Sequence, residues 1–122
     1  MNVLAFDTCL GAVSVAVRWQ GPGGDWLTRH AHEARERGHA ERLMPMIAEV
    51  MEDAGLAFSD LDRIAVTVGP GTFTGVRVGV AAARGLALAS GVIVYAWLPP
   101  ELTVVTPFGV MLPFAPAEAV MV

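Results

Sequence analysis

The stretch Gly69-Pro70-Gly71-Thr72-Phe73-Thr74-Gly75 decides the fold of this chain. It lies between an apolar run at 64–68, typical of a strand, and a run at 76–90, typical of a helix. Its three glycines allow a sharp turn and a close approach by another part of the backbone. Thr72 or Thr74 can cap the helix that follows. Such a turn either holds an anion through its N–H groups or packs two elements tightly together.

The chain before this stretch predicts three strands. Residues 3–6 form a short apolar run, typical of a strand buried on both faces. Residues 13–18 alternate between valine and other side chains, which is the period of a strand. After a Gly-Pro-Gly-Gly turn at 21–24, residues 26–32 predict a third strand. One face of this third strand would carry Trp26, Thr28, His30 and His32. We expect these strands to form an antiparallel meander.

Helices and strands alternate in the rest of the domain. Apolar residues at helical spacing predict a helix over 39–54, and Gly55 ends it. A strand at 64–68, a helix at 76–90 and a strand at 92–97 follow. This βββαβαβ order is that of an α/β, ribonuclease-H-like half-domain, the repeating unit of the actin, Hsp70 and sugar-kinase superfamily. No internal repeat is present, so we expect one half only.

Composition divides the chain into a domain at 1–98 and a proline-rich apolar tail at 99–122. The tail holds five of the eight prolines, and 102–105 is its candidate strand. The whole chain of 122 residues is 54% apolar and only 16% charged, a surplus that favours a large interface. Neither apolar run, 85–100 or 102–117, reaches the ~20 residues that a membrane helix needs. We therefore expect no membrane association.

Charge and cysteine content limit the classes of partner. The net charge is −4, all eight basic residues are arginines, and they form no basic block. Direct binding of nucleic acid is therefore not expected. The single Cys9 excludes an internal disulfide and is typical of a reducing compartment, so we expect a cytoplasmic protein. No base or positive charge lies near Cys9 in the sequence to activate its thiol.

Two interpretations of the loop and of the end of the first strand stay open. The loop lacks the Gly-Lys-Ser/Thr ending of a Walker A motif, and the chain has no lysine. Backbone N–H groups could still hold a phosphate, with Asp7 positioning magnesium as in actin-like proteins. The alternative is a tight structural turn in which Asp7 bonds its own backbone, and we favour it. The candidate cofactor-binding residues are Asp7, Thr8, Gly69, Gly71 and Thr72.

Small residues mark one side of the second helix. Gly75, Gly79, Ala82, Ala83 and Ala87 would let another helix approach closely. We expect this stripe to face away from the sheet, while Val76, Val80 and Leu88 face it. Arg77 and Arg84, seven residues apart, share a face and either pair with acidic groups of a partner or remain solvated.

The remaining polar residues predict no catalytic set. His30, His32 and His39 lie close together in sequence and two imidazoles can hold a metal, but surface histidines are the favoured interpretation. No His-Glu-x-x-His motif is present. We therefore expect no catalytic residue, no metal site and no cofactor.

Three segments resemble one known family. Ala5-Phe6-Asp7-Thr8, residues 39–45 and residues 69–79 together, in this order, are similar to the TsaB (YeaZ) family, once described as glycoprotease or peptidase M22 homologues. The resemblance covers about 1–98 and does not continue after Trp97, where the family has a second domain of similar fold.

The resemblance implies a non-catalytic subunit of the machinery that makes threonylcarbamoyladenosine in tRNA. Such a subunit pairs with the catalytic paralogue TsaD, and the ATPase TsaE joins the pair. Without the paralogue, the same surface could form an isologous homodimer. The pairing surface would include Glu41, Arg42, Leu43, Gly75, Arg77, Gly79, Ala82, Ala83 and Arg84. The alternative function is an ATP-binding, actin-like phosphotransferase or hydrolase with a degenerate site.

Overall fold

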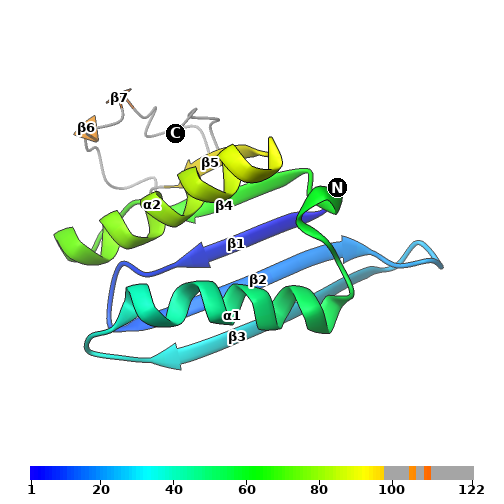
Figure 1. Cartoon of the computed structure of the whole chain (residues 1–122), viewed down its shortest axis with the longest axis horizontal. Helices are drawn as coiled ribbons and strands as arrows, with labels where there is room; N and C mark the ends of the chain where they lie inside the picture. Colours follow the sequence, from blue (N-terminus) through cyan, green and yellow to red (C-terminus); the bar gives the residue numbers. More distant parts are fainter. Residues whose placement is uncertain (98–104, 107–108, 111–122) are drawn as a thin grey trace.

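The chain folds around a five-stranded mixed sheet with two helices on one face (Figure 1). The computed structural model describes residues 1–97, 105–106 and 109–110. The spatial order of the strands is β3-β2-β1-β4-β5. Their bounds are β1 Val3–Asp7, β2 Ala12–Gln20, β3 Trp26–Ala34, β4 Arg63–Thr67 and β5 Ile93–Trp97. The two long helices are α1, His39–Ala54, and α2, Phe73–Ser90, and a short 3-10 turn spans Phe58–Asp60.

The central strand β1 joins the antiparallel and parallel halves of the sheet. It pairs antiparallel with β2, which pairs antiparallel with β3, so the predicted meander is confirmed. On its other side β1 runs parallel to β4, and β4 runs parallel to β5. Ala5 pairs with Ala16 on one side and with Ala65 on the other. The predicted α/β, ribonuclease-H-like half-domain is confirmed.

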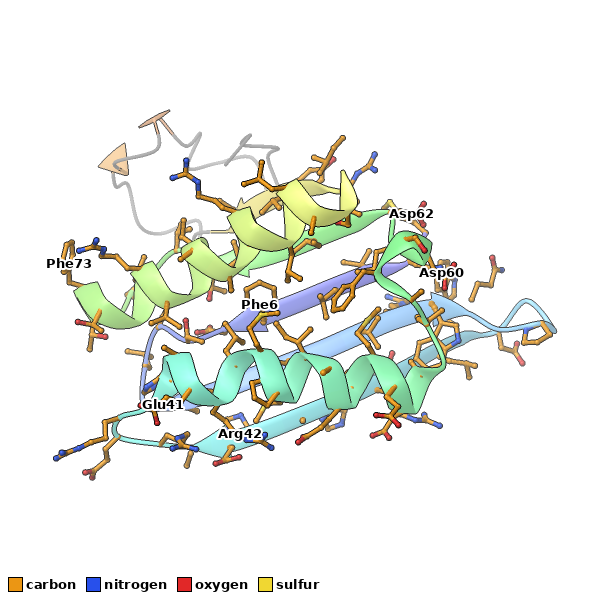
Figure 2. All side chains as sticks on the ribbon, in the orientation of Figure 1. Phe6, Glu41, Arg42, Asp60, Asp62 and Phe73 are labelled. Carbon is orange, nitrogen blue, oxygen red and sulfur yellow. The ribbon has the colours of Figure 1, made fainter. Side chains whose placement is uncertain are left out.

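The core lies between the helices and one face of the sheet. Figure 1 shows α1 in front of β2 and β3, and α2 in front of β4 and β5. Alternate residues of β1, β2 and β4 are buried toward the helices, as strand period requires. In Figure 2, Phe6 of β1 lies between the two helices. The fully buried apolar side chains of this core include Leu4, Val13, Val17, Leu43, Ile47 and Ile64.

The first helix has the predicted bounds, and the second begins earlier than predicted. Gly55 ends α1 in a left-handed conformation, at φ 71°, which a glycine adopts without steric cost. The first turn of α2 begins at Phe73 instead of residue 76. The Thr72 side chain accepts a hydrogen bond from the Gly75 N–H at 2.9 Å and so caps a turn that contains a glycine.

Part of the tail is described. Strands β6, Val105–Thr106, and β7, Gly109–Val110, pair antiparallel in a separate small sheet. Of the candidate strand at 102–105, only Val105 is described, and it belongs to β6. The rest of the predicted tail, and the domain boundary at residue 98, lie outside the described residues. In the part of the chain that the structure describes, no helix has the length and apolar character to cross a membrane.

Candidate functional site: the glycine loop and the helical groove

The glycine loop packs directly against the turn that follows β1. The Thr72 N–H donates to the Cys9 carbonyl at 2.9 Å. A Cβ at position 71 would overlap that carbonyl, and a Cβ at position 75 would overlap the Thr8 carbonyl. Glycine is therefore required for the close approach of two backbones at both positions. The loop serves as a tight junction between β1 and α2, which is the structural interpretation that the sequence favoured.

Thr8 fastens this junction from the strand side. Its side chain is 1% exposed, and its hydroxyl donates a 2.6 Å hydrogen bond to the Gly75 carbonyl. A Cβ at Gly79, one turn later, would lie only 2.9 Å from the Thr8 hydroxyl oxygen and 3.1 Å from Val66 Cγ2. The glycines at 75 and 79 allow α2 to lie close to the sheet, and the buried Thr8 hydroxyl bonds the helix to the end of β1.

Asp7 forms a local turn. Its carboxylate accepts a 2.7 Å hydrogen bond from the Cys9 N–H, two residues later. The Cys9 side chain is buried beside Thr67, and burial raises the pKa of its thiol, so the thiolate is scarce at neutral pH.

The structure brings all five candidate cofactor residues together at one junction. Thr8, Gly71 and Thr72 make contacts there within the chain itself.

His30 and His32 share one face of β3, and His39 lies apart from them at the start of α1. The Ser14 hydroxyl and the His32 Nδ1 atom lie 2.7 Å apart on neighbouring strands. The His39 Nε2 atom lies 2.7 Å from the Leu10 carbonyl, to which its N–H donates, at the start of α1. Among the described residues, no group of three or more His, Cys, Asp or Glu side chains could hold a metal ion.

Three residues of the small-residue stripe of α2 face the sheet, so the predicted orientation is wrong for Gly75, Gly79 and Ala83, whereas Val80 is buried as predicted. Gly75, Gly79 and Ala83 are all buried. Gly75 and Gly79 pack against the turn after β1, and Gly79 also against Val66 of β4, because only small residues allow the helix to lie so close. The larger Leu88, which was expected to face the sheet, is 88% exposed instead. Gly75, Gly79 and Ala83 therefore offer no surface to a partner. Ala82, by contrast, is partly buried against the core and lines the groove between the helices.

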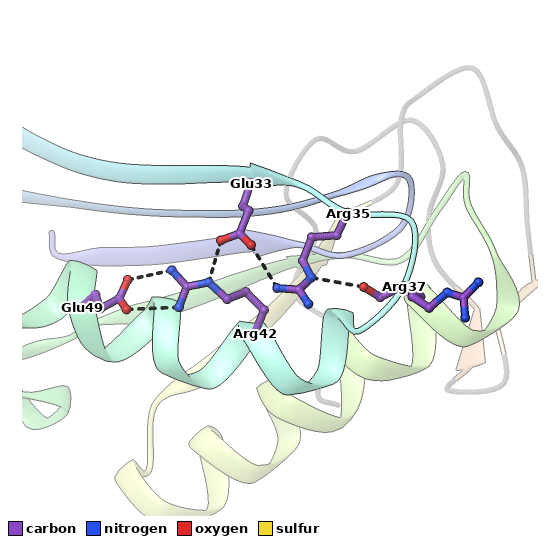
Figure 3. Close-up of polar contacts among 5 residues, drawn as sticks. All are labelled: Glu33, Arg35, Arg37, Arg42 and Glu49. Carbon is purple, nitrogen blue, oxygen red and sulfur yellow. Dashed lines mark hydrogen bonds and ion pairs between the residues drawn. The ribbon is translucent and has the colours of Figure 1, made fainter.

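Two predicted interface residues of α1 have their main contacts within the chain. Leu43 is 1% exposed and belongs to the core. Arg42 bonds Glu33 of β3 at 2.7 Å and holds Glu49, two turns further along α1, at 3.0 and 3.1 Å (Figure 3). These hydrogen bonds lower the pKa of both carboxyl groups. Arg42 thus joins α1 to the edge strand, and its guanidinium is already paired on two sides.

An apolar groove runs between α1 and α2. It has a volume of about 500 Å³, and its lining residues are Ala40, Leu43, Met44, Phe73, Thr74, Arg77, Val78, Ala81 and Ala82. Phe73 is 75% exposed and Met44 is 43% exposed, although both are large and apolar. The Arg77 guanidinium lies 5.0 Å from the centre of the Phe73 ring. Figure 2 shows Phe73 projecting outward from the first turn of α2.

The groove contains some predicted interface residues and others that the sequence analysis missed. Leu43, Arg77 and Ala82 line it. Glu41 is exposed and lines a neighbouring pocket, whereas Arg84 is exposed further along α2, beside a different pocket. Phe73 and Met44 were missed. The signal for Phe73 was the capping threonine at 72, which makes Phe73 the first residue of the helix. Met44 follows directly after a core leucine, so helical spacing alone places it on a different face.

Comparison with known proteins identifies the relatives of this arrangement. The family model described as TsaD, tRNA N6-adenosine threonylcarbamoyltransferase, matches residues 32–96, which include α1, β4, α2 and most of β5. The tRNA threonylcarbamoyladenosine biosynthesis protein TsaB of Haemophilus influenzae is 41% identical over 87 residues. The chain belongs to the TsaB (YeaZ) family. That match covers 71% of this chain and 35% of the relative.

Solved structures agree with this family. YeaZ from Pseudomonas aeruginosa is 41% identical and superposes with a TM-score of 0.67, covering 78% of this chain and 42% of that one. RuvC of Thermus thermophilus, at 18% identity and a TM-score of 0.52 over 81% of this chain and 64% of that one, shares the fold alone. This TsaB-family chain therefore spans about a third to two fifths of the length of the TsaB and YeaZ proteins that it matches.

Proposed function

We propose that this chain is a non-catalytic subunit in tRNA threonylcarbamoyladenosine biosynthesis. It binds a TsaD-like paralogue through the groove between α1 and α2, and a TsaE-like ATPase joins the pair. The observation that carries the proposal is the exposed apolar surface made by Phe73 and Met44 on two neighbouring helices. Large exposed aromatic and methionine side chains around a groove are typical of protein interfaces.

The shape of the groove favours a helical partner. Its walls are two helices, and small side chains at Ala40, Ala81 and Ala82 leave room between them. An amphipathic helix can lay its apolar face into such a groove. Arg77 at the rim would pair with an acidic group of the partner while its stem covers the Phe73 ring. Membership of the TsaB family supports a TsaD-like paralogue as that partner.

A binding experiment with a matched control tests the proposal. Phe73→Glu should weaken binding to purified TsaD by about 2 kcal/mol or more, roughly thirtyfold, as expected for an aromatic anchor. Leu88→Glu is the control, because Leu88 is an equally exposed apolar residue of α2 that lies outside the groove. Equal binding by both variants and the unchanged chain would contradict the proposal, as would the absence of any complex.

Calorimetry separates this function from the ATP-binding alternative. The loop N–H groups of Thr72 and Gly75 already donate to Cys9 and Thr72 within the chain, which leaves them unavailable to a phosphate. Titration of the full chain with ATP and magnesium should therefore release no binding heat. Saturable heat that disappears in Asp7→Asn would favour the enzyme instead.

A further inference from the structure

Met44 is a methionine whose side chain lies in the helical groove. It is 43% exposed, and it lines the groove together with Phe73 of the facing helix. The other methionines that the structure describes are placed differently. Met46 and Met51 are buried in the core, and Met1 is exposed at the N-terminus and does not line the groove. Within the described residues, Met44 is therefore the one methionine side chain that both solvent and a groove partner can reach.

The single cysteine of the chain does not compete with Met44 for an oxidant. The Cys9 side chain is buried, and its Sγ atom lies 3.4 Å from the Thr67 hydroxyl oxygen. Burial raises the pKa of the Cys9 thiol, so little of the reactive thiolate is present at neutral pH. A thioether has no proton to lose, and its oxidation depends on how easily the oxidant reaches the sulfur. An oxidant in solution should therefore react with Met44 before Cys9.

We propose that Met44 is a site of reversible oxidation by hydroperoxides and that this oxidation releases the partner from the groove. The second half of the proposal rests on the proposed function. The thioether sulfur attacks one oxygen of hydrogen peroxide, so an S–O bond forms as the O–O bond breaks. The sulfur loses two electrons, and the departing hydroxide takes the proton of the transferred oxygen and leaves as water. The product is methionine sulfoxide, which methionine sulfoxide reductases convert back to methionine.

The surroundings of Met44 explain why a sulfoxide would weaken the complex. Most side chains that line the groove are apolar, and only Thr74 and Arg77 among them carry hydrogen-bond donors. The Arg77 guanidinium is placed over the Phe73 ring. In the free chain, water satisfies the sulfoxide oxygen. An apolar helix seated in the groove would remove that water, and burial of a polar oxygen without its hydrogen bonds is unfavourable.

The position of Met44 separates binding from folding. Oxidation of a core methionine disrupts the packing around it, but Met44 lies outside the hydrophobic core cluster. The oxidised chain should therefore keep its fold and lose only affinity for the partner. The coupling is reciprocal, because a partner seated in the groove would cover the Met44 side chain and slow its oxidation.

Peptide mapping tests the site of oxidation without any partner. The full chain is treated with hydrogen peroxide, and catalase then removes the peroxide. Cleavage after Arg42 and Arg63 releases one peptide that carries Met44, Met46 and Met51, so the two buried methionines are internal controls. Met44 should be oxidised roughly tenfold faster than either of them. Equal rates at the three methionines, in a chain that circular dichroism shows to be folded, overturn the proposal.

A binding titration tests the consequence. The oxidised chain should bind purified TsaD roughly tenfold more weakly or worse, and methionine sulfoxide reductase should restore the affinity. Met44→Leu should bind TsaD with little change and keep its affinity after peroxide treatment, because leucine has a similar volume and no sulfur. Met111→Leu and Met121→Leu, whose methionines lie outside the described residues, are the controls and should stay sensitive to peroxide. Sensitivity that persists in Met44→Leu overturns the proposal.

The two proposals can fail separately. If the untreated chain binds no TsaD, the proposed function fails and the release of a partner fails with it, while the peptide map still decides whether Met44 is the oxidised residue. If Phe73→Glu loses TsaD but the oxidised chain binds as well as the untreated one, the groove stands as the docking site and the release by oxidation is overturned.

Discussion

The Thr8 hydroxyl donates a 2.6 Å hydrogen bond to the Gly75 carbonyl, across 67 residues of sequence. This bond links the end of β1 to the first turn of α2, where a side chain on the glycine would overlap the Thr8 carbonyl. One buried threonine and one glycine therefore set how closely the second helix approaches the sheet. The groove that lies on the outer side of this helix depends on that position.

Replacing Thr8 with valine should destabilise the fold. The substitution keeps the shape but removes the hydroxyl, and it leaves the buried Gly75 carbonyl without this partner. The expected loss is about 1–3 kcal/mol in the free energy of unfolding, measured by urea denaturation. Thr28→Val is the control, because Thr28 is exposed on β3. Equal stability of the two variants would show that the hydrogen bond is not important.

Two glycines of α2 should respond in opposite ways to alanine. Gly85 has nothing within 4 Å of an added Cβ, so Gly85→Ala should stabilise the helix by about 0.5–1 kcal/mol. At Gly79 the added Cβ would meet Thr8 and Val66, and overpacking of this kind costs about 1–3 kcal/mol. Thermal unfolding should therefore rank Gly85→Ala above the unchanged chain and Gly79→Ala below it. The reverse order would mean that α2 does not lie so close to the sheet.

Leu43 and Met44 are neighbours in sequence with different expected roles. Leu43→Ala should reduce the free energy of unfolding by about 2–5 kcal/mol, because its side chain is 1% exposed in the core. Met44→Ala should change stability little, since Met44 is 43% exposed, and should weaken TsaD binding instead. Denaturation and a binding titration on the same two variants check this. A large stability loss in Met44→Ala would place it in the core.

Acid should weaken the attachment of α1 to β3. Hydrogen bonds from Arg42 hold the pKa of Glu33 and of Glu49 below the ordinary value. A carboxyl group with a lowered pKa in the folded state contributes stability above its unfolded pKa, and this contribution disappears as pH falls through the folded value. Stability should therefore fall below about pH 4.5, the usual region for glutamate.

Arg42→Met is the variant that isolates this effect. It keeps an apolar stem at the position and removes the charged partner of Glu33 and Glu49. Denaturation from neutral to acidic pH should show a smaller pH dependence in the variant than in the unchanged chain. Added salt should reduce the difference, because the three side chains are partly exposed. Identical pH profiles would show that the ion pairs do not contribute.

Local sequence patterns were sufficient for most of the fold. Valines at alternate positions from Val13 to Val17 predicted β2, and Gly55 gave the end of α1. The start of α2 was placed three residues late, because Gly75 is a poor helix former by itself. Its N–H bond to the Thr72 side chain compensates, and that bond is visible only when both residues are placed.

The candidate surface was predicted less well, for a geometric reason. Small residues on a helix allow close packing, but they do not indicate whether the helix packs against its own sheet or against another protein. Gly79 and Ala83 pack against the chain's own sheet, whereas Phe73 and Met44 face the groove. Arg42 was expected to face a partner and instead bonds Glu33 of β3. Which strand lies beside a helix is a long-range property, and periodicity along one helix carries no information about it.

The sequence by itself determined the order of the elements, the turn at the glycine loop and the family. Each of these depends on neighbouring residues: alternation, capping and backbone freedom act over a few positions. The tertiary structure alone decided which side of α2 is buried, which side chains line the groove, and that a row of alanines crosses the face of the sheet opposite the helices. Those depend on contacts between β1 and residues about sixty positions further along the chain.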